Sequence, residues 1–199
     1  VASTLGLPKG SLPAAAETII NGTPHPFDIG LFGEDKYFAY VAAFGAFTEV
    51  SYATPQDQKR VLGRLAYIIQ GAASLPNIEP HKMRVEYDDG AIEGSFLYGG
   101  FSNSTSIAGV IKLPEQLVCL GDGKSELILV PEQSLEDYGL LAANILHGTI
   151  DTDRVFILHT KKARFISENP VAWTRDGEDG GAHTDLTLKT IHAPVSIIF

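Results

Sequence analysis

Cysteine, basic residues and long apolar runs are all scarce in this sequence of 199 residues. The single cysteine, Cys119, excludes an internal disulfide framework and a cysteine-rich zinc site, and it fits a reducing cytosol. Only 15 Lys and Arg residues stand against 24 Asp and Glu residues, and the formal charge of −9 argues against a protein that wraps nucleic acid. No apolar run approaches the ~18 residues of a membrane-spanning helix, and the first residues lack the pattern of a signal peptide. We therefore expect a cytoplasmic protein without nucleic acid as a partner.

The residues that are present predict one folded, mainly β domain. Hydrophobic residues make up 44% of the chain, and 20 glycines and 11 prolines mark turns along its length. No alternation of strand and helix typical of a parallel sheet is visible, so the spacing favours an antiparallel β-sandwich of mainly β (α+β) class. Runs rich in strand-forming residues lie between the turn signals, at residues 25–32, 36–44, 83–87, 91–101, 127–130, 154–159, 163–167, 171–175, 184–192 and 195–199.

Helix signals appear in three segments, which we expect to form two or three helices at the periphery of the sandwich. The first segment is residues 11–21, between a capping serine and a glycine stop. The second is residues 54–69, where apolar residues recur at helical spacing. The third is residues 134–148, which opens with a capping box formed by Ser134 and Asp137.

Five segments, taken in order along the chain, form a recognisable set. They are residues 27–30 leading into 37–38, then 42–50, 62–67, 120–124 (Leu-Gly-Asp-Gly-Lys) running into 127–130, and 175–181 (Arg-Asp-Gly-Glu-Asp-Gly-Gly). Each segment is unspecific alone. Together they resemble the diacylglycerol kinase catalytic family, in its bacterial lipid-kinase branch, which is related to sphingosine kinases. The resemblance covers most of the chain from about Phe27 onward and implies the C-terminal domain of a lipid kinase.

Parts of the family pattern differ or are absent. Ala46 and Phe47 stand where the family has an aromatic-Asp pair, and residues 102–109 replace a glycine-rich stretch. The family's Gly-Gly-Asp-Gly-Thr nucleotide loop and its Gly-Thr-x-Asn-Asp segment do not occur in the sequence. We therefore expect residues 1–23 to be a remnant or linker from the missing nucleotide-binding domain and residues 24–199 to be the C-terminal β-sandwich. This chain alone is then expected to be inactive.

The resemblance implies that Glu178 is the general base that takes the proton of the lipid hydroxyl. Phosphoryl transfer relies on positioning and charge stabilisation, so a carboxylate that orients the attacking hydroxyl suits this reaction. The resemblance also implies that Glu49 contacts the lipid headgroup and that Arg60 approaches the phosphates of ATP, a cofactor bound mostly by the missing half. The alternatives are a solvated turn acid for Glu178 and a solvated helix face for Arg60.

The Gly-Asp-Gly segment resembles the family's motif for a bound Mg²⁺ or similar ion. Asp122 would supply a carboxylate, Cys119 and Lys124 main-chain carbonyls, and water the remaining ligands, a set that suits a hard cation. The alternative is an Asp-Gly turn that needs no metal. The side chain of Cys119 is expected to be buried as a small hydrophobic group. The six histidines show no metal-ligand spacing.

The leading functional hypothesis is an ATP-dependent lipid kinase acting on a diacylglycerol-like or sphingoid lipid. Two alternatives stay open: a non-catalytic β-sandwich that binds lipid or a partner, and an NAD-kinase-like enzyme. The intact Asp-Gly-Glu argues against the first, and the order of the motifs argues against the second. The aromatic residues Phe38, Phe44, Phe47 and Trp173 fit either an acyl-chain cleft or core packing. The sequence leaves open peripheral contact with a membrane and the formation of a homo-oligomer.

Overall fold

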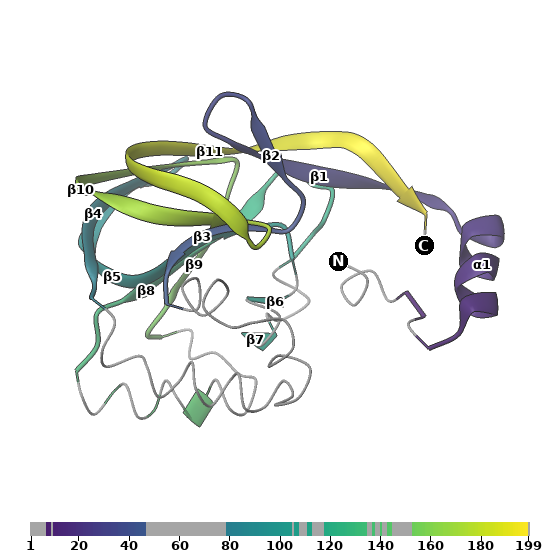
Figure 1. Cartoon of the computed structure of the whole chain (residues 1–199), viewed down its shortest axis with the longest axis horizontal. Helices are drawn as coiled ribbons and strands as arrows, with labels where there is room; N and C mark the ends of the chain where they lie inside the picture. Colours follow the sequence, from purple (N-terminus) through teal and green to yellow (C-terminus); the bar gives the residue numbers. More distant parts are fainter. Residues whose placement is uncertain are drawn as a thin grey trace.

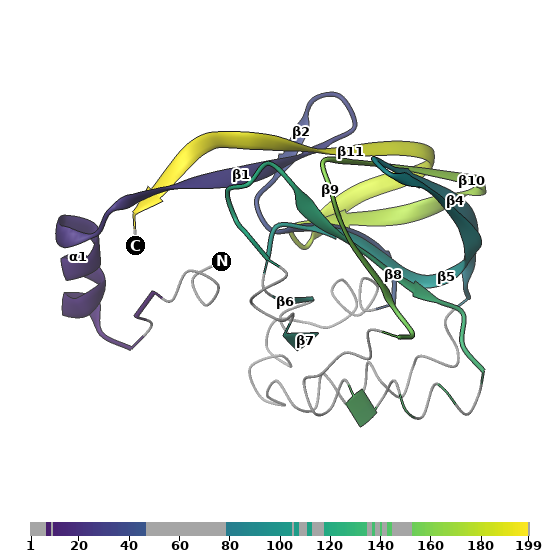
Figure 2. The same cartoon turned by 180° about the vertical axis from the view of Figure 1, so that it is seen from behind.

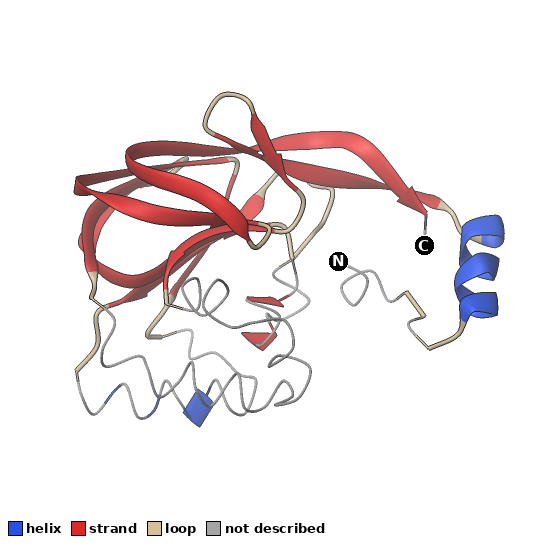
Figure 3. Cartoon of the chain, in the orientation of Figure 1, coloured by secondary structure: helices blue, strands red, loops and turns tan. Residues whose placement is uncertain are grey.

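Strands dominate the structure, a computed structural model, as the red ribbons of Figure 3 show. It describes residues 7–8, 10–46, 79–104, 106–107, 111–112, 118–134, 137, 140, 143–144 and 153–198. The elements are, in chain order, α1 (Leu12–Asn21), β1 (Pro24–Phe32), β2 (Lys36–Phe38), β3 (Val41–Gly45), β4 (His81–Tyr87), β5 (Gly90–Ser102), β6 (Ser106–Ile107), β7 (Ile111–Lys112), β8 (Ser125–Pro131), β9 (Phe156–Thr160), β10 (Lys162–Arg175) and β11 (Glu178–Ile198).

Strands β3 and β4 lie end to end within the main sheet. Strand β10 pairs with β4 along its first half and with β3 along its second half, and β5 does the same from the other side. The strand order is therefore β2-β1-β11-β10, then β4 and β3 together, then β5-β8-β9, with antiparallel pairing throughout. Figures 1 and 2 show from opposite sides that this sheet curls around its own core. Strands β6 and β7 form a separate two-stranded sheet.

Strand β10 changes its partner near Pro170. Its register against β11 shifts between Ile166 and Val171, and a proline fits such a position because it has no N–H to donate to the ladder. The predicted strands at 163–167 and 171–175 are therefore halves of one strand, because the chain passes the irregularity without leaving the sheet.

Strand β11 likewise unites two predicted strands. Residues 184–192 and 195–198 both belong to it, and the break predicted between them is a bulge at Ala193, whose φ is 45°. A bulge adds residues to one strand without ending its pairing. Asp28 on β1 lies opposite this bulge.

An aromatic cluster fills the space inside the curled sheet. Trp173, which is 2% exposed, packs edge to face against Phe44 and Phe165, with ring centroids 5.0 and 4.8 Å away. Gly99 on β5 makes room for this packing, because a Cβ there would lie 2.1 Å from a carbon of the Phe44 ring. Phe38 belongs to the same buried cluster. Core packing therefore accounts for Phe38, Phe44 and Trp173, while Phe47 lies outside the described residues.

The predicted class, mainly β with antiparallel strands, is confirmed, and so is the first helix. Ser11 caps α1 by accepting a hydrogen bond from the Ala14 N–H at 3.3 Å. Ser134 accepts one from the Asp137 N–H at 3.2 Å, which is the first of the two bonds of a capping box, while the Asp137 carboxylate accepts the Ser134 hydroxyl at 2.7 Å. Beyond the helical residues at 137, 140, 143 and 144, the third predicted helix lies outside the described residues, as does the helix predicted at 54–69. No helix in the described part is long and apolar enough to cross a membrane.

The first residues of β1 and the last residues of β11 form a two-stranded arm that projects from the curled sheet, with α1 at its far end (Figures 1 and 2). Helix α1 buries none of its residues. Its apolar side chains Leu12, Ile19 and Ile20 are 87%, 69% and 77% exposed. An apolar helix of ten residues held away from the core gains little stability from the domain that carries it.

Candidate functional site

Glu178, the predicted general base, stands at the tip of the β10–β11 hairpin. It pairs with Arg175, so that Asp176 and Gly177 alone form the turn. Their φ angles are 50° and 87°, and two consecutive positive values identify the type I′ turn that Asp-Gly sequences favour. The side chain of Glu178 is exposed and therefore open to a substrate.

Asp176 fastens this turn to the loop between β2 and β3. Its Oδ2 accepts the N–H of Ala39 at 2.7 Å, and its Oδ1 accepts those of Tyr40 and Val41, both at 2.9 Å. The Asp176 N–H in turn donates to the Val41 carbonyl at 2.8 Å. One carboxylate therefore binds three consecutive amides of a segment about 135 residues away in sequence.

The chain is also fixed on the other side of Glu178. Asp179 accepts the Gly181 N–H at 2.8 Å, which closes a small turn within β11. Gly180 is packed so closely against the main chain of Trp173 that a Cβ would lie 2.9 Å from its carbonyl oxygen. Glu178 is thus an exposed carboxylate on a backbone that is held before and after it.

The Gly-Asp-Gly segment forms a second turn, just before β8. Asp122 Oδ1 accepts the Lys124 N–H at 3.0 Å, which is an Asx turn. Lys124 is half-buried. Cys119 is exposed, so the expected burial of its thiol is wrong, because the residue lies in the loop that leads into this turn.

Asp28, which is fully buried, anchors the Gly-Asp-Gly turn to the sheet. Its Oδ2 accepts the Gly123 N–H at 2.6 Å, and its Oδ1 accepts the Ala193 N–H at 2.7 Å and lies 3.0 Å from His192 Nδ1. Residues 192–194 of β11 stand opposite this single residue of β1, because the register shifts between Phe27 and Ile29. The bulge thereby turns donors toward the buried carboxylate.

Asn103, at the end of β5, joins the two turns. Its side-chain amide donates to the carbonyls of Asp28 and Leu120, at 2.8 and 3.3 Å. Its main-chain N–H donates to the carbonyl of Tyr40 at 3.1 Å. Since Asp176 also binds Tyr40, hydrogen bonds connect the Gly-Asp-Gly turn to the Asp-Gly-Glu hairpin without a break.

Glu126 is a buried carboxyl group beside the Gly-Asp-Gly turn. Its side chain is 1% exposed, and neither oxygen has a hydrogen-bond partner among the described residues. Burial raises the pKa of Glu126 to about 8, and the nearby Asp122 charge adds to this. The main-chain N–H groups of Glu126 and Ser104, which lie near the carboxyl group but outside hydrogen-bond geometry, oppose the shift. The Nε2 of His159 lies 3.7 Å from Glu126 Oε1 and 3.4 Å from Asp122 Oδ2.

Unpartnered buried acceptors on two sides of this turn suit a hard cation or bound water. Besides Glu126, the Oδ1 of Asn103 is buried without a hydrogen-bond partner in the described part of the chain. No three His, Cys, Asp or Glu side chains among the described residues are placed to hold a metal ion by themselves. A cation here would therefore depend on Asp122 together with water and main-chain carbonyls, for which the family resemblance implies Cys119 and Lys124.

The structure brings the predicted base and the predicted cation turn into one hydrogen-bonded framework, while Glu49 and Arg60 lie outside the described residues. Sequence reasoning gave no functional role to the residues that build the framework. Their type alone carries little signal, because each acts on a partner distant in sequence. These residues are Asp28, Asn103, Asp176 and His192, and the buried Glu126 with its neighbour His159 lies beside them.

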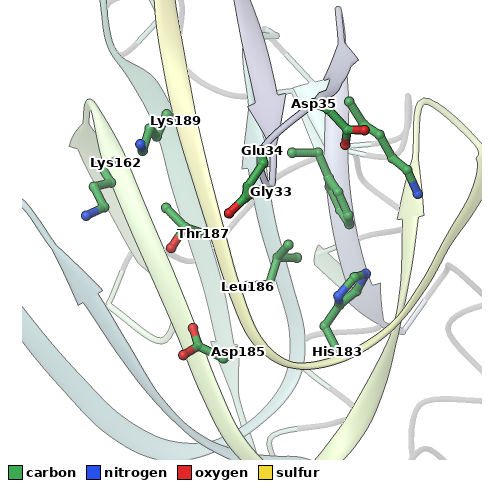
Figure 4. A pocket seen from close by; sticks show the side chains of 11 residues that line it. Gly33, Glu34, Asp35, Lys162, His183, Asp185, Leu186, Thr187 and Lys189 are labelled. Atoms are coloured by element: carbon green, nitrogen blue, oxygen red, sulfur yellow. The ribbon is translucent and has the colours of Figure 1, made fainter.

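A groove of about 500 Å³ lies elsewhere, between the β1–β2 turn and strands β10 and β11. Figure 4 shows Lys162 and Lys189 side by side at one rim of it. Acidic residues share the lining, and one of them, Asp185, is paired with Arg164 at 2.5 Å. None of the predicted site residues lines this groove, and its mixed charge favours no single class of ligand.

Comparisons with known proteins agree with the resemblance seen in the sequence, although no protein-family profile matches the chain. The diacylglycerol kinase of Bacillus subtilis (strain 168) is 33% identical over 183 residues, which cover 90% of this chain and 59% of that protein. The diacylglycerol kinase of Staphylococcus saprophyticus is 34% identical over 171 residues, covering 84% and 55%. The chain thus spans a little more than half the length of these relatives.

Solved structures share the fold. Two crystal structures of Bacillus anthracis str. Sterne chains described as diacylglycerol kinases superpose with TM-scores of 0.78 and 0.70, at 19% and 15% identity. Each covers 100% of this chain, which in turn corresponds to 64% and 62% of the two solved chains. The sequence relatives and the shared fold lead to one conclusion: this chain belongs to the bacterial diacylglycerol kinase family.

Proposed function

We propose that this chain is the C-terminal, lipid-binding and base-bearing part of a kinase that transfers the γ-phosphate of ATP to a lipid hydroxyl. The substrate class is a diacylglycerol-like or sphingoid lipid. The observation that supports this most directly is the exposed Glu178 on a hairpin whose turn is fastened by three main-chain amides. A base must be reachable by its substrate and must keep its position, and this hairpin meets both requirements.

In the proposed reaction, Glu178 accepts the proton of the lipid hydroxyl. The lipid oxygen forms a bond to the γ-phosphorus, the bond from that phosphorus to the β–γ bridging oxygen breaks, and ADP leaves with the electron pair. A lipid hydroxyl is a poor nucleophile until a carboxylate takes its proton, and general bases typically contribute ~10²–10⁴-fold. The NAD-kinase-like alternative finds no separate support in the described geometry.

We further propose that Asp122 and the carbonyls of Cys119 and Lys124 hold a divalent cation, with Mg²⁺ as the candidate. Such an ion would supply positive charge beside the buried Glu126 and would tighten the turn that Asp28 anchors. Glu126 and Asn103 offer their unpartnered oxygens to the water around it. The Gly-Asp-Gly turn then contributes Asp122 to the ion, while Asp28 from β1 and Asn103 from the end of β5 hold the turn in place.

The nucleotide is proposed to bind mostly to a second half that is outside these residues. The exposed apolar side chains of α1, and those of Val195 and Ile198 at the end of the arm, give that half a surface to pack against. Residues 1–23 then form the linker between the halves. Such a kinase meets its lipid at the cytoplasmic face of a membrane, through peripheral contact.

The experiment compares residues 1–199 alone with the same residues fused to the nucleotide-binding half of a relative. Both proteins are incubated with ATP, Mg²⁺ and diacylglycerol in mixed micelles, and lipid phosphate is measured. The fusion is expected to phosphorylate the lipid, while the chain alone shows no turnover, because glycine-rich amides that cradle phosphates are missing from it. Turnover by the chain alone at the rate of the fusion would overturn the proposal that a second half is needed to bind the nucleotide.

A further inference from the structure

We infer that Asp176 is a positioning residue for the phosphoryl transfer and acts by fixing the place of Glu178. The inference rests on the proposed function of Glu178 as the base. It adds a second residue to that reaction, one that touches neither lipid nor nucleotide. Its evidence is the set of contacts that Asp176 makes across the hairpin.

The carboxylate of Asp176 is fully engaged by main-chain donors. It receives three N–H groups from Ala39, Tyr40 and Val41, at distances between 2.7 and 2.9 Å. Hydrogen bonds to an ionised carboxylate are stronger than neutral ones. Each oxygen accepts at least one of these bonds, so the carboxylate of Asp176 is committed to residues 39–41, while the exposed side chain of Glu178 has no hydrogen-bond partner among the described residues.

Because the turn contains only two residues, a displacement of Asp176 also displaces Glu178. In a two-residue turn the residues on either side form the last pair of the ladder, and here that pair is Arg175 and Glu178. Only Gly177 separates Asp176 from the base. Gly177 has a φ of 87° and no atom within 4 Å of the place where a Cβ would lie, so this residue adds no packing contact of its own to the tip.

The sheet itself does not depend on these three bonds. Strand β10 is already paired with β3 from Trp173 to Arg175, and Thr174 Oγ1 donates to the Ala43 carbonyl at 3.3 Å. The bonds of Asp176 begin where this pairing ends. They fix the hairpin tip relative to residues 39–41. These residues are in turn held by Asn103, whose main-chain N–H donates to the Tyr40 carbonyl.

The substitution that tests this is Asp176→Asn. Asparagine has nearly the same size and tolerates a positive φ, but its NH₂ group presents a donor to main-chain N–H groups. The matched control is Asp88→Asn, because Asp88 also accepts a main-chain N–H, that of Lys161 at 2.7 Å, on a different hairpin. Both variants are made in the complete two-half kinase, together with Glu178→Gln and the double variant D176N/E178Q.

We expect D176N to lower kcat by roughly 10–100-fold while the KM for diacylglycerol stays within about twofold, because a displaced base affects the chemical step. D88N should leave both unchanged. In the E178Q background, D176N should change kcat by less than about twofold, since a residue that acts only through Glu178 has nothing left to position. Amide exchange at residues 39–41 should become faster in D176N and not in D88N.

Other outcomes would overturn the inference in distinguishable ways. If E178Q loses activity while D176N keeps the wild-type kcat, the base assignment stands and the positioning role of Asp176 is wrong. If D176N lowers kcat equally with and without the Glu178 carboxylate, or leaves the protein unfolded, Asp176 has a purely structural role. If E178Q itself keeps normal kcat, the proposed function fails, and the inference about Asp176 fails with it.

Discussion

The Oδ2 atom of Asp28 lies 2.6 Å from the Gly123 nitrogen, although 95 residues separate the two in sequence. This bond fixes the Gly-Asp-Gly turn to β1 from inside the protein, because Asp28 is fully buried. The same carboxylate also accepts the Ala193 N–H from the bulge of β11. One side chain thus holds together the sheet, the bulge and the turn proposed to bind a cation.

Replacing Asp28 with alanine should therefore destabilise the chain. The change leaves the N–H groups of Gly123 and Ala193 without an acceptor, and each unsatisfied buried group costs about 1–3 kcal/mol. We expect the free energy of unfolding, measured with urea, to fall by about 3 kcal/mol or more. Asp35→Ala on the exposed β1–β2 turn is the control and should change it by less than about 0.5 kcal/mol. A loss in Asp28→Ala no larger than in the control would show that the buried bonds carry no stability.

The buried Glu126 should make stability depend on pH. Its pKa rises from 4.5 to about 8 on folding, mainly through burial, so between these values the folded chain holds a proton that the unfolded chain has released. The stabilisation is complete at low pH and is lost as the pH rises through about 8. Between about pH 5 and about pH 8 the unfolding free energy of the wild type should fall on the order of a few kcal/mol more than that of Glu126→Gln.

Glu93→Gln provides the control for this titration. Glu93 is an exposed glutamate on β5 that pairs with Arg84, so its substitution should leave the pH dependence of the wild type in place. Parallel pH profiles for the wild type and Glu126→Gln would contradict the burial of a titrating carboxyl group at this site.

Added Mg²⁺ should raise the melting temperature of the chain if Asp122 holds a cation. A ligand that binds only the folded state at 100 times its Kd adds about 2.7 kcal/mol. Asp122→Asn should remove this effect. Asp179→Asn should keep it, because Asp179 forms the same kind of side-chain turn, with the Gly181 N–H, away from the proposed site. Equal stabilisation of both variants by Mg²⁺ would mean that the ion binds elsewhere or nonspecifically.

Local features of this fold could be predicted from the sequence, while contacts between distant segments could not. The Ser134–Asp137 capping box and the Asp-Gly turn at residues 176–177 follow from residues three or fewer positions apart. The union of residues 163–167 and 171–175 into β10 depends on two different partner strands, which local propensity does not reveal. The placing of β3 and β4 end to end is likewise a property of the whole sheet.

The candidate site divides in the same way. The motif around Glu178 is visible in the sequence because its residues are adjacent. The clamp by Asp176 is not, since its three donors lie about 135 residues away. Glu126 begins an apolar strand and gives no sign of burial, because an acid there is equally compatible with a solvated strand end. Its raised pKa follows from packing and from the neighbouring Asp122, both of which need the fold.

The central claim is that Glu178 takes the proton from the lipid hydroxyl, and the kcat of Glu178→Gln in the complete kinase tests it most directly. The substitution keeps the size of the side chain and removes its capacity to accept a proton. We expect kcat to fall by about 10²–10⁴-fold, with the KM for diacylglycerol nearly unchanged. A folded Glu178→Gln enzyme that retains the wild-type kcat would contradict the account and leave Glu178 as a turn residue.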